Sequence, residues 1–313
     1  MSHLQVVKGG EVMGLGLADY VWLDEGGRIS WKKMTVLIAK NERGEPAPLI
    51  SRQTIEFPKG KTLVLVPVHY LPDPTRPQPN FIVLCETKDG NDKPVFWNYR
   101  AQLREAMLKR GHDSKLLWFG FEQTYSLGDA RGSAYDAPRA IDLEERKFMS
   151  SERFLGATFD AGLLIHSTSG YPGSTVSNFK VGVRGFPQDI DPDPPHALVV
   201  ADHMVLARYL MHKIGAGRGL VPSWAALSAF VSSATMREAS MKSAALVEAN
   251  LMLEVLEDLG SIRLLPHAER GGTRCIGVDP KFEVNTNPYQ LALDVLCAVM
   301  PIEQEENPSE SVE

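Results

Sequence analysis

Short apolar runs separated by turn residues dominate the first hundred positions of the chain. Runs of this kind predict β-strands, and they cover residues 20–24, 34–39, 62–68 and 81–85. The segment 71–79 contains four prolines. Because proline cannot donate to a sheet ladder, we expect an ordered loop there.

Beyond residue 94 the pattern alternates between helical and strand periods. Apolar spacing predicts helices over residues 101–110, 143–159, 194–214, 242–259 and 289–300, and strands over residues 116–122, 179–183 and 227–231. This alternation behind an all-strand front predicts an α+β protein, with a small β-rich domain over residues 1–94 and a larger domain over residues 95–301. Residues 302–313 are acidic and lack an apolar face, so we expect a disordered tail.

Composition narrows the class of protein. Hydrophobic residues make up 43% and charged residues 23%, with a net charge of -6 and a pI of about 5.8. These values are typical of a soluble globular protein and argue against a nucleic-acid partner. The chain has no apolar run long enough to span a membrane and no signal-peptide pattern at its start, so we expect a cytoplasmic protein. Cys85, Cys275 and Cys297 are widely spaced, which predicts buried free thiols.

Four short stretches of the chain carry sequence motifs, and the motifs occur in a fixed order. The stretches are residues 18–24, 73–86, 118–125, and 201–212 followed by 236–238. They resemble the glutamine synthetase family, and its eukaryote-like type II branch in particular. The resemblance implies a small β-grasp-like N-terminal domain, then a catalytic domain whose curved antiparallel sheet and flanking helices form a metal-holding cleft. It also implies subunit rings, and phosphorylation of glutamate by ATP with Mg or Mn before ammonia attacks.

The resemblance also points to metal ligands, and most of them are replaced here. Where the family has Glu-x-Glu on a strand, this chain has Glu122 and Thr124, which alternation places on one face. A further family glutamate corresponds to Asn178, and another, less securely aligned, to Tyr171. Near the C-terminus, Glu283 keeps the glutamate of a Phe-Glu motif. Glu122 and Glu283 are therefore the expected metal-facing acids, two of the six ligands that the family pattern requires.

The residues that the resemblance implies for nucleotide binding are also largely replaced or missing. Ser228 aligns with the family histidine that follows a glycine-rich loop, and the loop itself reads 224–227 without glycines. Glycines let a backbone approach phosphates closely, so their loss lowers that access. A stretch of family residues before Glu283 is missing here, which leaves Arg270 and Arg274 as the arginines expected to bind phosphate or cofactor.

The sequence therefore predicts a glutamine-synthetase-like protein that does not make glutamine and acts as a pseudoenzyme in binding, regulation or assembly. We expect a homo-oligomeric ring or a hetero-oligomer with an active relative. The alternative is a remodelled ATP-dependent γ-glutamyl ligase acting on an amine, in which Asp129, Asp136 and Asp142 could replace the lost acids. A third interpretation is a sensor that binds an amino acid or amine. His203 and His212 are expected to pack or to donate hydrogen bonds to backbone groups.

Overall fold

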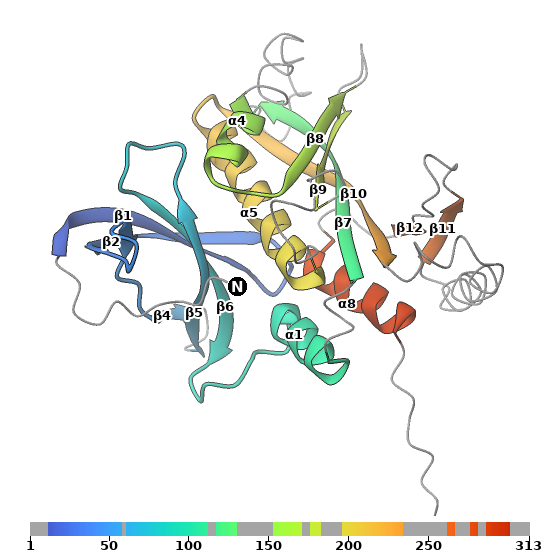
Figure 1. Ribbon diagram of the computed structural model, residues 1–313, viewed down its shortest axis with the longest axis horizontal. Helices are drawn as coiled ribbons and strands as arrows, with labels where there is room; N and C mark the ends of the chain where they lie inside the picture. The colour runs from blue at the N-terminus through green and yellow to red at the C-terminus, as the bar shows by residue number, and fades with distance from the viewer. Residues whose placement is uncertain are drawn as a thin grey trace, which may run out of the picture.

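The computed structural model describes residues 12–57, 61–111, 117–129, 153–170, 176–182, 196–233, 262–266, 276–280 and 286–300. Within these ranges the protein is α+β, with two six-stranded sheets and four helices (Figure 1). The helix expected over residues 242–259 and the tail expected over residues 302–313 lie outside the described residues.

The first sheet is built entirely from the first ninety residues. Its strands are β1 (Val12–Leu23), β2 (Ile29–Lys40), β3 (Pro46–Pro48), β4 (Gln53–Phe57), β5 (Lys61–Pro72) and β6 (Phe81–Asp89), in the spatial order β3-β2-β1-β6-β5-β4. The central pair β1 and β6 is parallel and the other pairs are antiparallel. The four predicted strands are present, each longer than its apolar run, and the predicted proline loop connects β5 to β6.

Both faces of this sheet are buried at its centre. On β1, Tyr20 belongs to one buried cluster and its neighbour Val21 to the other. On β6, Val83 and Leu84 divide in the same way. Successive side chains of a strand point to opposite faces, so burial on both sides explains why these strands appear in the sequence as unbroken apolar runs.

The second sheet is antiparallel throughout its described pairs. Its strands are β7 (Leu117–Asp129), β8 (Ile165–Gly170), β9 (Val176–Val181), β10 (Leu220–Ser233), β11 (Ile262–Pro266) and β12 (Ile276–Pro280), in the order β11-β12-β10-β7-β9-β8. Three of these strands were predicted. β8 was not, because its sequence has a single aliphatic residue, Ile165, and its place in the sheet comes from pairing with β9.

The described helices are α1 (Tyr99–Lys109), α4 (Phe154–Asp160), α5 (Ala197–Ala216) and α8 (Pro288–Val299). Asn98 and Asn287 cap α1 and α8, because their side-chain oxygens accept backbone N–H groups of the first turn. α4 starts at Phe154, and the earlier part of the helix predicted over residues 143–159 lies outside the described residues. It ends before Gly162, whose φ of 72° suits glycine at a helix exit.

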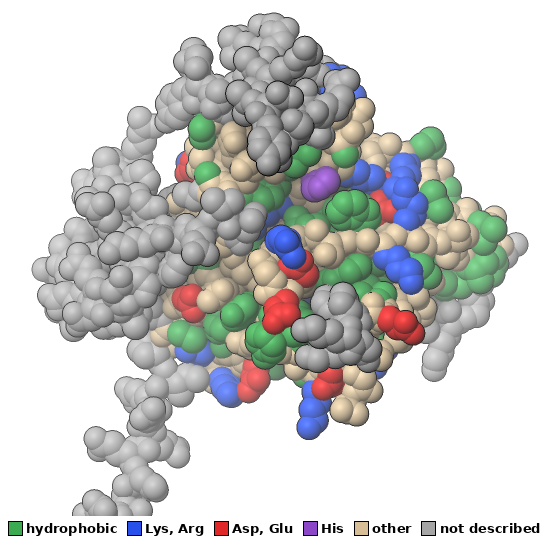
Figure 2. Space-filling model, turned by 180° about the vertical axis from the view of Figure 1, so that it is seen from behind, with side chains coloured by type: hydrophobic (Ala, Val, Ile, Leu, Met, Phe, Trp, Pro, Cys, Tyr) green, Lys and Arg blue, Asp and Glu red, His purple; other side chains and the backbone are tan. Residues whose placement is uncertain are grey.

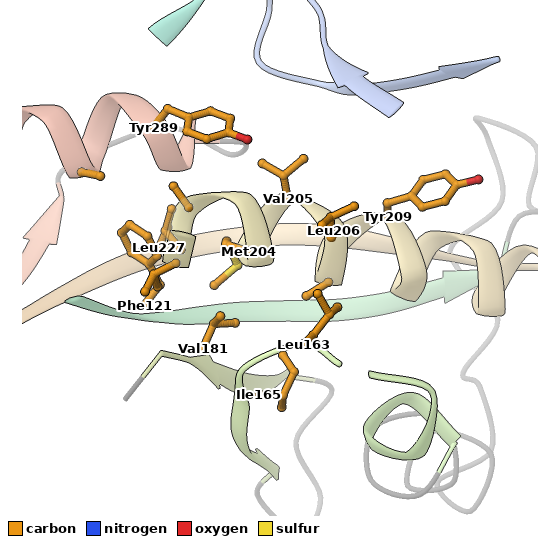
Figure 3. Close-up of a cluster of buried hydrophobic side chains, with 14 of the residues drawn as sticks. Phe121, Leu163, Ile165, Val181, Met204, Val205, Leu206, Tyr209, Leu227 and Tyr289 are labelled. Atoms are coloured by element: carbon orange, nitrogen blue, oxygen red, sulfur yellow. The ribbon is translucent and has the colours of Figure 1, made fainter. Parts of the chain in front are cut away.

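Helix α5 lies between the two sheets and contributes more buried residues to the larger core cluster than any other element (Figure 3). Met204 points toward Phe121 of β7 and Leu227 of β10, while Val205 lies on the other side of the helix near Tyr289 of α8. A helix that is apolar around most of its circumference is typically buried on several sides, as here. α5 therefore holds one face of the second sheet and leaves the other face to carry polar residues.

Buried ion pairs fix the contact between α1, α5 and the first sheet. Arg100 donates through Nε to Oδ1 of Asp202 at 2.8 Å and through Nη2 to Oδ2 at 2.9 Å, a bidentate pair. The Tyr289 hydroxyl donates to Oδ1 of Asp202 at 2.7 Å, and Arg104 donates to Oε2 of Glu86 at 2.6 Å. Burial removes a carboxylate from water, and these cationic and hydroxyl partners compensate for the lost hydration of each one.

Among the described residues, no helix is long and apolar enough to cross a membrane. Acidic and basic side chains are interspersed on the face in Figure 2, so neither sign dominates its described part. The prediction of buried cysteines holds for Cys85 and is wrong for Cys297, which is exposed. Apolar residues around Cys297 suggested burial, but it lies on the outward side of α8, next to the buried Leu296. Cys275 lies outside the described residues.

Candidate functional site

The face of the second sheet that points away from α5 is polar. On β7, Phe121, Gln123 and Tyr125 are buried toward the helix, whereas Glu122 and Thr124 between them are partly exposed. Alternation along the strand gives the two faces their different character. The sequence therefore predicted correctly that residues 122 and 124 share a face.

Strand pairing brings more of the predicted positions to this face. Glu122 lies opposite Ser228 of β10 and opposite Lys180 of β9. Thr124 lies opposite Asn178 of β9. Residues opposite each other in antiparallel strands project to the same side. We call the surface formed by Glu122, Thr124, Asn178, Lys180 and Ser228 the polar face.

Both carboxylate oxygens of Glu122 have partners from β9. Nζ of Lys180 lies 3.1 Å from Oε2, and the side-chain amide of Asn178 donates to Oε1. Asn178 is itself held, because the hydroxyl of Ser169 on β8 donates to its carbonyl oxygen. Glu122 is 20% exposed and Lys180 34% exposed at the side chain, so the pair lies at the surface of the polar face. The acid is thus engaged within the chain.

A fully buried arginine supports β7 from the side of α5. Arg208 donates through Nε to the side-chain oxygen of Gln123 at 2.9 Å, and through Nη1 to the carbonyl of Thr286 at 2.9 Å. Its guanidinium lies 5.5 Å from the ring centre of Trp224. Burial lowers the pKa of Arg208 to about 9. The sequence had matched Arg208 and Gln123 to family motifs without indicating that the two side chains meet.

The predicted loop over residues 224–227 is wrong. These residues are part of β10, and the register between β10 and β7 shifts between Trp224 and Leu227, which marks a β-bulge. A bulge accommodates an additional residue by bending the strand rather than by ending it. Ser228 follows the bulge and so faces Glu122, on a strand and not at the end of a phosphate-binding loop.

Several predicted site residues lie outside the described residues: Glu283, Arg270, Arg274, Tyr171, Asp136 and Asp142. Asp129 ends β7, seven residues beyond Glu122. At a rise of roughly 3.4 Å per residue, the two backbones are about 24 Å apart along the strand.

The described donor set does not fit the Mg or Mn ions that the resemblance implies. Divalent magnesium and calcium prefer carboxylates, carbonyls and water, with several oxygen ligands. On the polar face the described acidic ligand is Glu122, with Lys180 in contact, and no described group of three or more His, Cys, Asp or Glu residues is arranged to hold a metal ion. At an effective dielectric near 20, two unit charges about 4 Å apart interact by roughly 4 kcal/mol, so a dication meets about twice that repulsion from an ammonium at this distance.

The two helix histidines have different roles. Nδ1 of His203 accepts the backbone N–H of Leu164 at 2.9 Å, so the expected packing role holds but its backbone bond is made as an acceptor. His212 packs edge-on against Trp31 of β2, with ring centres 5.2 Å apart. Neither contact involves the polar face.

Lys180 and Ser169 are the residues of this arrangement that sequence reasoning missed. The signal for Lys180 was present, because it stands two residues after Asn178 and a strand places both on one face. Ser169 gave no signal, since β8 was not predicted.

Comparisons with known proteins agree with the motifs. No protein-family model matches the chain. It is 27% identical to the glutamine synthetase of Emericella nidulans over 219 residues, 68% of this chain and 60% of that protein. It is also 27% identical to those of Neurospora crassa, over 63% of this chain and 56% of that protein, and Suillus bovinus, over 66% and 59%. The chain thus spans less than two thirds of the length of these curated relatives.

Comparison of the fold with solved structures also finds a glutamine synthase homolog. A crystal structure described as a novel glutamine synthase homolog superimposes with a TM-score of 0.61 at 14% identity, covering 92% of this chain and 82% of that one. The two sheets and their helices therefore define a glutamine-synthetase-like fold. With the sequence matches, the chain is a distant homologue of the fungal glutamine synthetases.

Proposed function

We propose that this protein is a glutamine-synthetase-like pseudoenzyme that does not make glutamine and instead serves as a binding, regulatory or assembly partner. The observation that carries the proposal is the state of Glu122. It is the acid at the position that the family resemblance assigns to metal, and both of its oxygens are engaged by Lys180 and Asn178.

Chemistry at the polar face supports this proposal. ATP-dependent phosphorylation needs divalent ions that bridge phosphates and offset charge in the transition state. Thr124 and Ser228 offer hydroxyl groups, which accept hydrogen bonds but carry no negative charge. A site with one engaged carboxylate is poorly matched to a metal–nucleotide complex.

The proposal includes the finer organisation expected from the resemblance. It comprises a β-grasp-like unit over residues 1–94, a catalytic-type unit with a curved sheet over residues 95–301, and assembly with copies of itself or with an active relative. Light scattering at micromolar protein concentration tests the assembly. A monomer would contradict that part of the proposal and leave the binding role to be tested.

The decisive experiment combines calorimetry and turnover on the full chain. ATP is titrated with and without Mg²⁺ or Mn²⁺, and phosphate release is followed with glutamate and ammonia, with a fungal glutamine synthetase as the positive control. We expect no metal-dependent ATP binding at micromolar concentration and no glutamate-dependent phosphate release. Release of phosphate that requires both glutamate and metal would refute the pseudoenzyme assignment.

The same assay with a panel of amines in place of ammonia tests the ligase alternative. Phosphate release that depends on one amine would establish a remodelled γ-glutamyl ligase. Such an enzyme would need acidic ligands in addition to Glu122, and Asp129, Asp136 and Asp142 remain the candidates for that role.

A further inference from the structure

The cationic group beside Glu122 comes from the chain itself. Lys180 is the direct partner of Glu122 in the register of β9 and β7, with Nζ 3.1 Å from Oε2. Asn178 lies two residues earlier on β9, hence on the same face, and binds the other oxygen. One strand thus supplies a charge partner and a hydrogen-bond partner for the same carboxylate.

This arrangement competes directly with a metal ion. A divalent ion that bound Glu122 would have to approach an oxygen to roughly 2.0–2.6 Å and displace Lys180 or Asn178 from it. An ammonium tethered to the neighbouring strand is always present at high local concentration, whereas a free ion must be recruited from solution. Serine and threonine hydroxyls at residues 228 and 124 do not add the charge that a dication would need.

We propose that Lys180 is the resident cation of the polar face. Its ammonium takes the place beside Glu122 that the family resemblance gives to a divalent metal, and it makes this face indifferent to Mg²⁺ and Mn²⁺. The inference rests on the proposed function and adds the residue that determines the metal independence. It makes Lys180 and Asn178 together the positions at which metal affinity can be restored.

The test is a titration of the full chain with MnCl₂ alone, in which electron paramagnetic resonance measures the free ion. We expect the double variant Asn178→Glu/Lys180→Gln to bind Mn²⁺ at least tenfold more tightly than the wild type. Lys180→Gln alone should give a gain of about threefold. The matched control is Lys109→Gln, which removes a lysine from an exposed pair with Glu105 on α1 and should leave Mn²⁺ binding unchanged.

The outcomes separate the inference from the proposed function. Wild-type Mn²⁺ binding that Glu122→Gln abolishes would overturn the inference even without turnover. A folded double variant, checked by circular dichroism, with no gain over the wild type would overturn it as well. If the double variant does not fold, the absence of a gain in Lys180→Gln decides the question. ATP turnover that Lys180→Gln leaves unchanged would refute the proposed function and leave the inference standing.

Discussion

Lowering the pH is expected to destabilise the contact between β5 and α5 through His203. Its ring faces His69 of β5, with ring centres 6.1 Å apart. Nδ1 of His203 accepts the Leu164 N–H, which requires that this nitrogen carry no proton. Burial is the main cause that lowers the pKa of His203, His69 adds to it and Asp202 opposes it, and together they bring the pKa to about 4. The folded protein therefore resists protonation of this ring.

The sign and size of the effect follow from linkage. Because the folded pKa lies below the ordinary value of 6.5, the unfolded chain takes up the proton first. The stability that His203 contributes is fully present above pH 6.5 and is lost as the pH falls toward 4. The loss from pH 7.5 is about 2 kcal/mol at pH 5 and about 3 kcal/mol at pH 4. His203 is partly exposed, so solvent screening makes these values upper bounds.

His69 and Asp202, which lie near His203, also make the stability of the fold depend on pH. Burial also lowers the pKa of His69, so it adds to the loss in the same range. Burial raises the pKa of Asp202, but Arg100 outweighs this and holds it below 3.8. The contribution of Asp202 is therefore present above pH 3.8 and lost only below it, outside the range of the histidines.

Urea unfolding at several pH values between 7.5 and 5 measures the effect. The variant His203→Asn keeps a side-chain acceptor for the Leu164 N–H and removes the titrating ring. We expect the wild type to lose up to about 2 kcal/mol over this range and the variant to lose distinctly less, with His69 accounting for the remainder. Equal pH dependence in the two proteins would refute the assignment of the effect to His203.

Two further substitutions, each with a control at an exposed residue, test a buried ion pair and a buried aromatic side chain in urea denaturation experiments. Arg100→Gln should lower the free energy of unfolding by about 3–5 kcal/mol because it leaves buried Asp202 without its bidentate partner. Arg52→Gln, which removes an exposed ion pair with Asp92, should cost less than about 1 kcal/mol. A similar cost for both would contradict the ion-pair argument. Phe121→Ala should cost about 3–5 kcal/mol through the cavity it leaves, and Phe159→Ala, at a residue that is 55% exposed, should change stability by about 0.5 kcal/mol or less.

Strong apolar patterns made much of the fold predictable. The unbroken apolar run at the start of β6 predicted a strand, and apolar residues at helical spacing predicted α5. β8 could not be found in the same way, because its polar sequence becomes a strand through hydrogen bonds to β9. The segment 224–227 was misassigned for a related reason: a bulge inside β10 has no distinct apolar pattern, and the resemblance alone suggested a loop.

The candidate site was predictable as a set of positions but not as a set of contacts. Glu122, Thr124, Asn178 and Ser228 were identified from the motifs, and strand register brings them to one face. The motifs showed that Thr124 and Asn178 stand where the family has acids, but they did not indicate a lysine in contact with Glu122. Lys180 could have been found from alternation along β9, whereas its contact with Glu122 depends on how β9 pairs with β7.

Alternation also explains how a site can change while its framework persists. On β7 the side chains that pack against α5 are Phe121, Gln123 and Tyr125, and those on the polar face are Glu122 and Thr124. A substitution at residue 124 or 178 therefore changes the charge of the polar face without altering volume in the core, where packing is close and costly to disturb. The same separation predicts that changes at Lys180 affect ion binding with little effect on folding, which is why the metal titration can distinguish a lost site from a damaged fold.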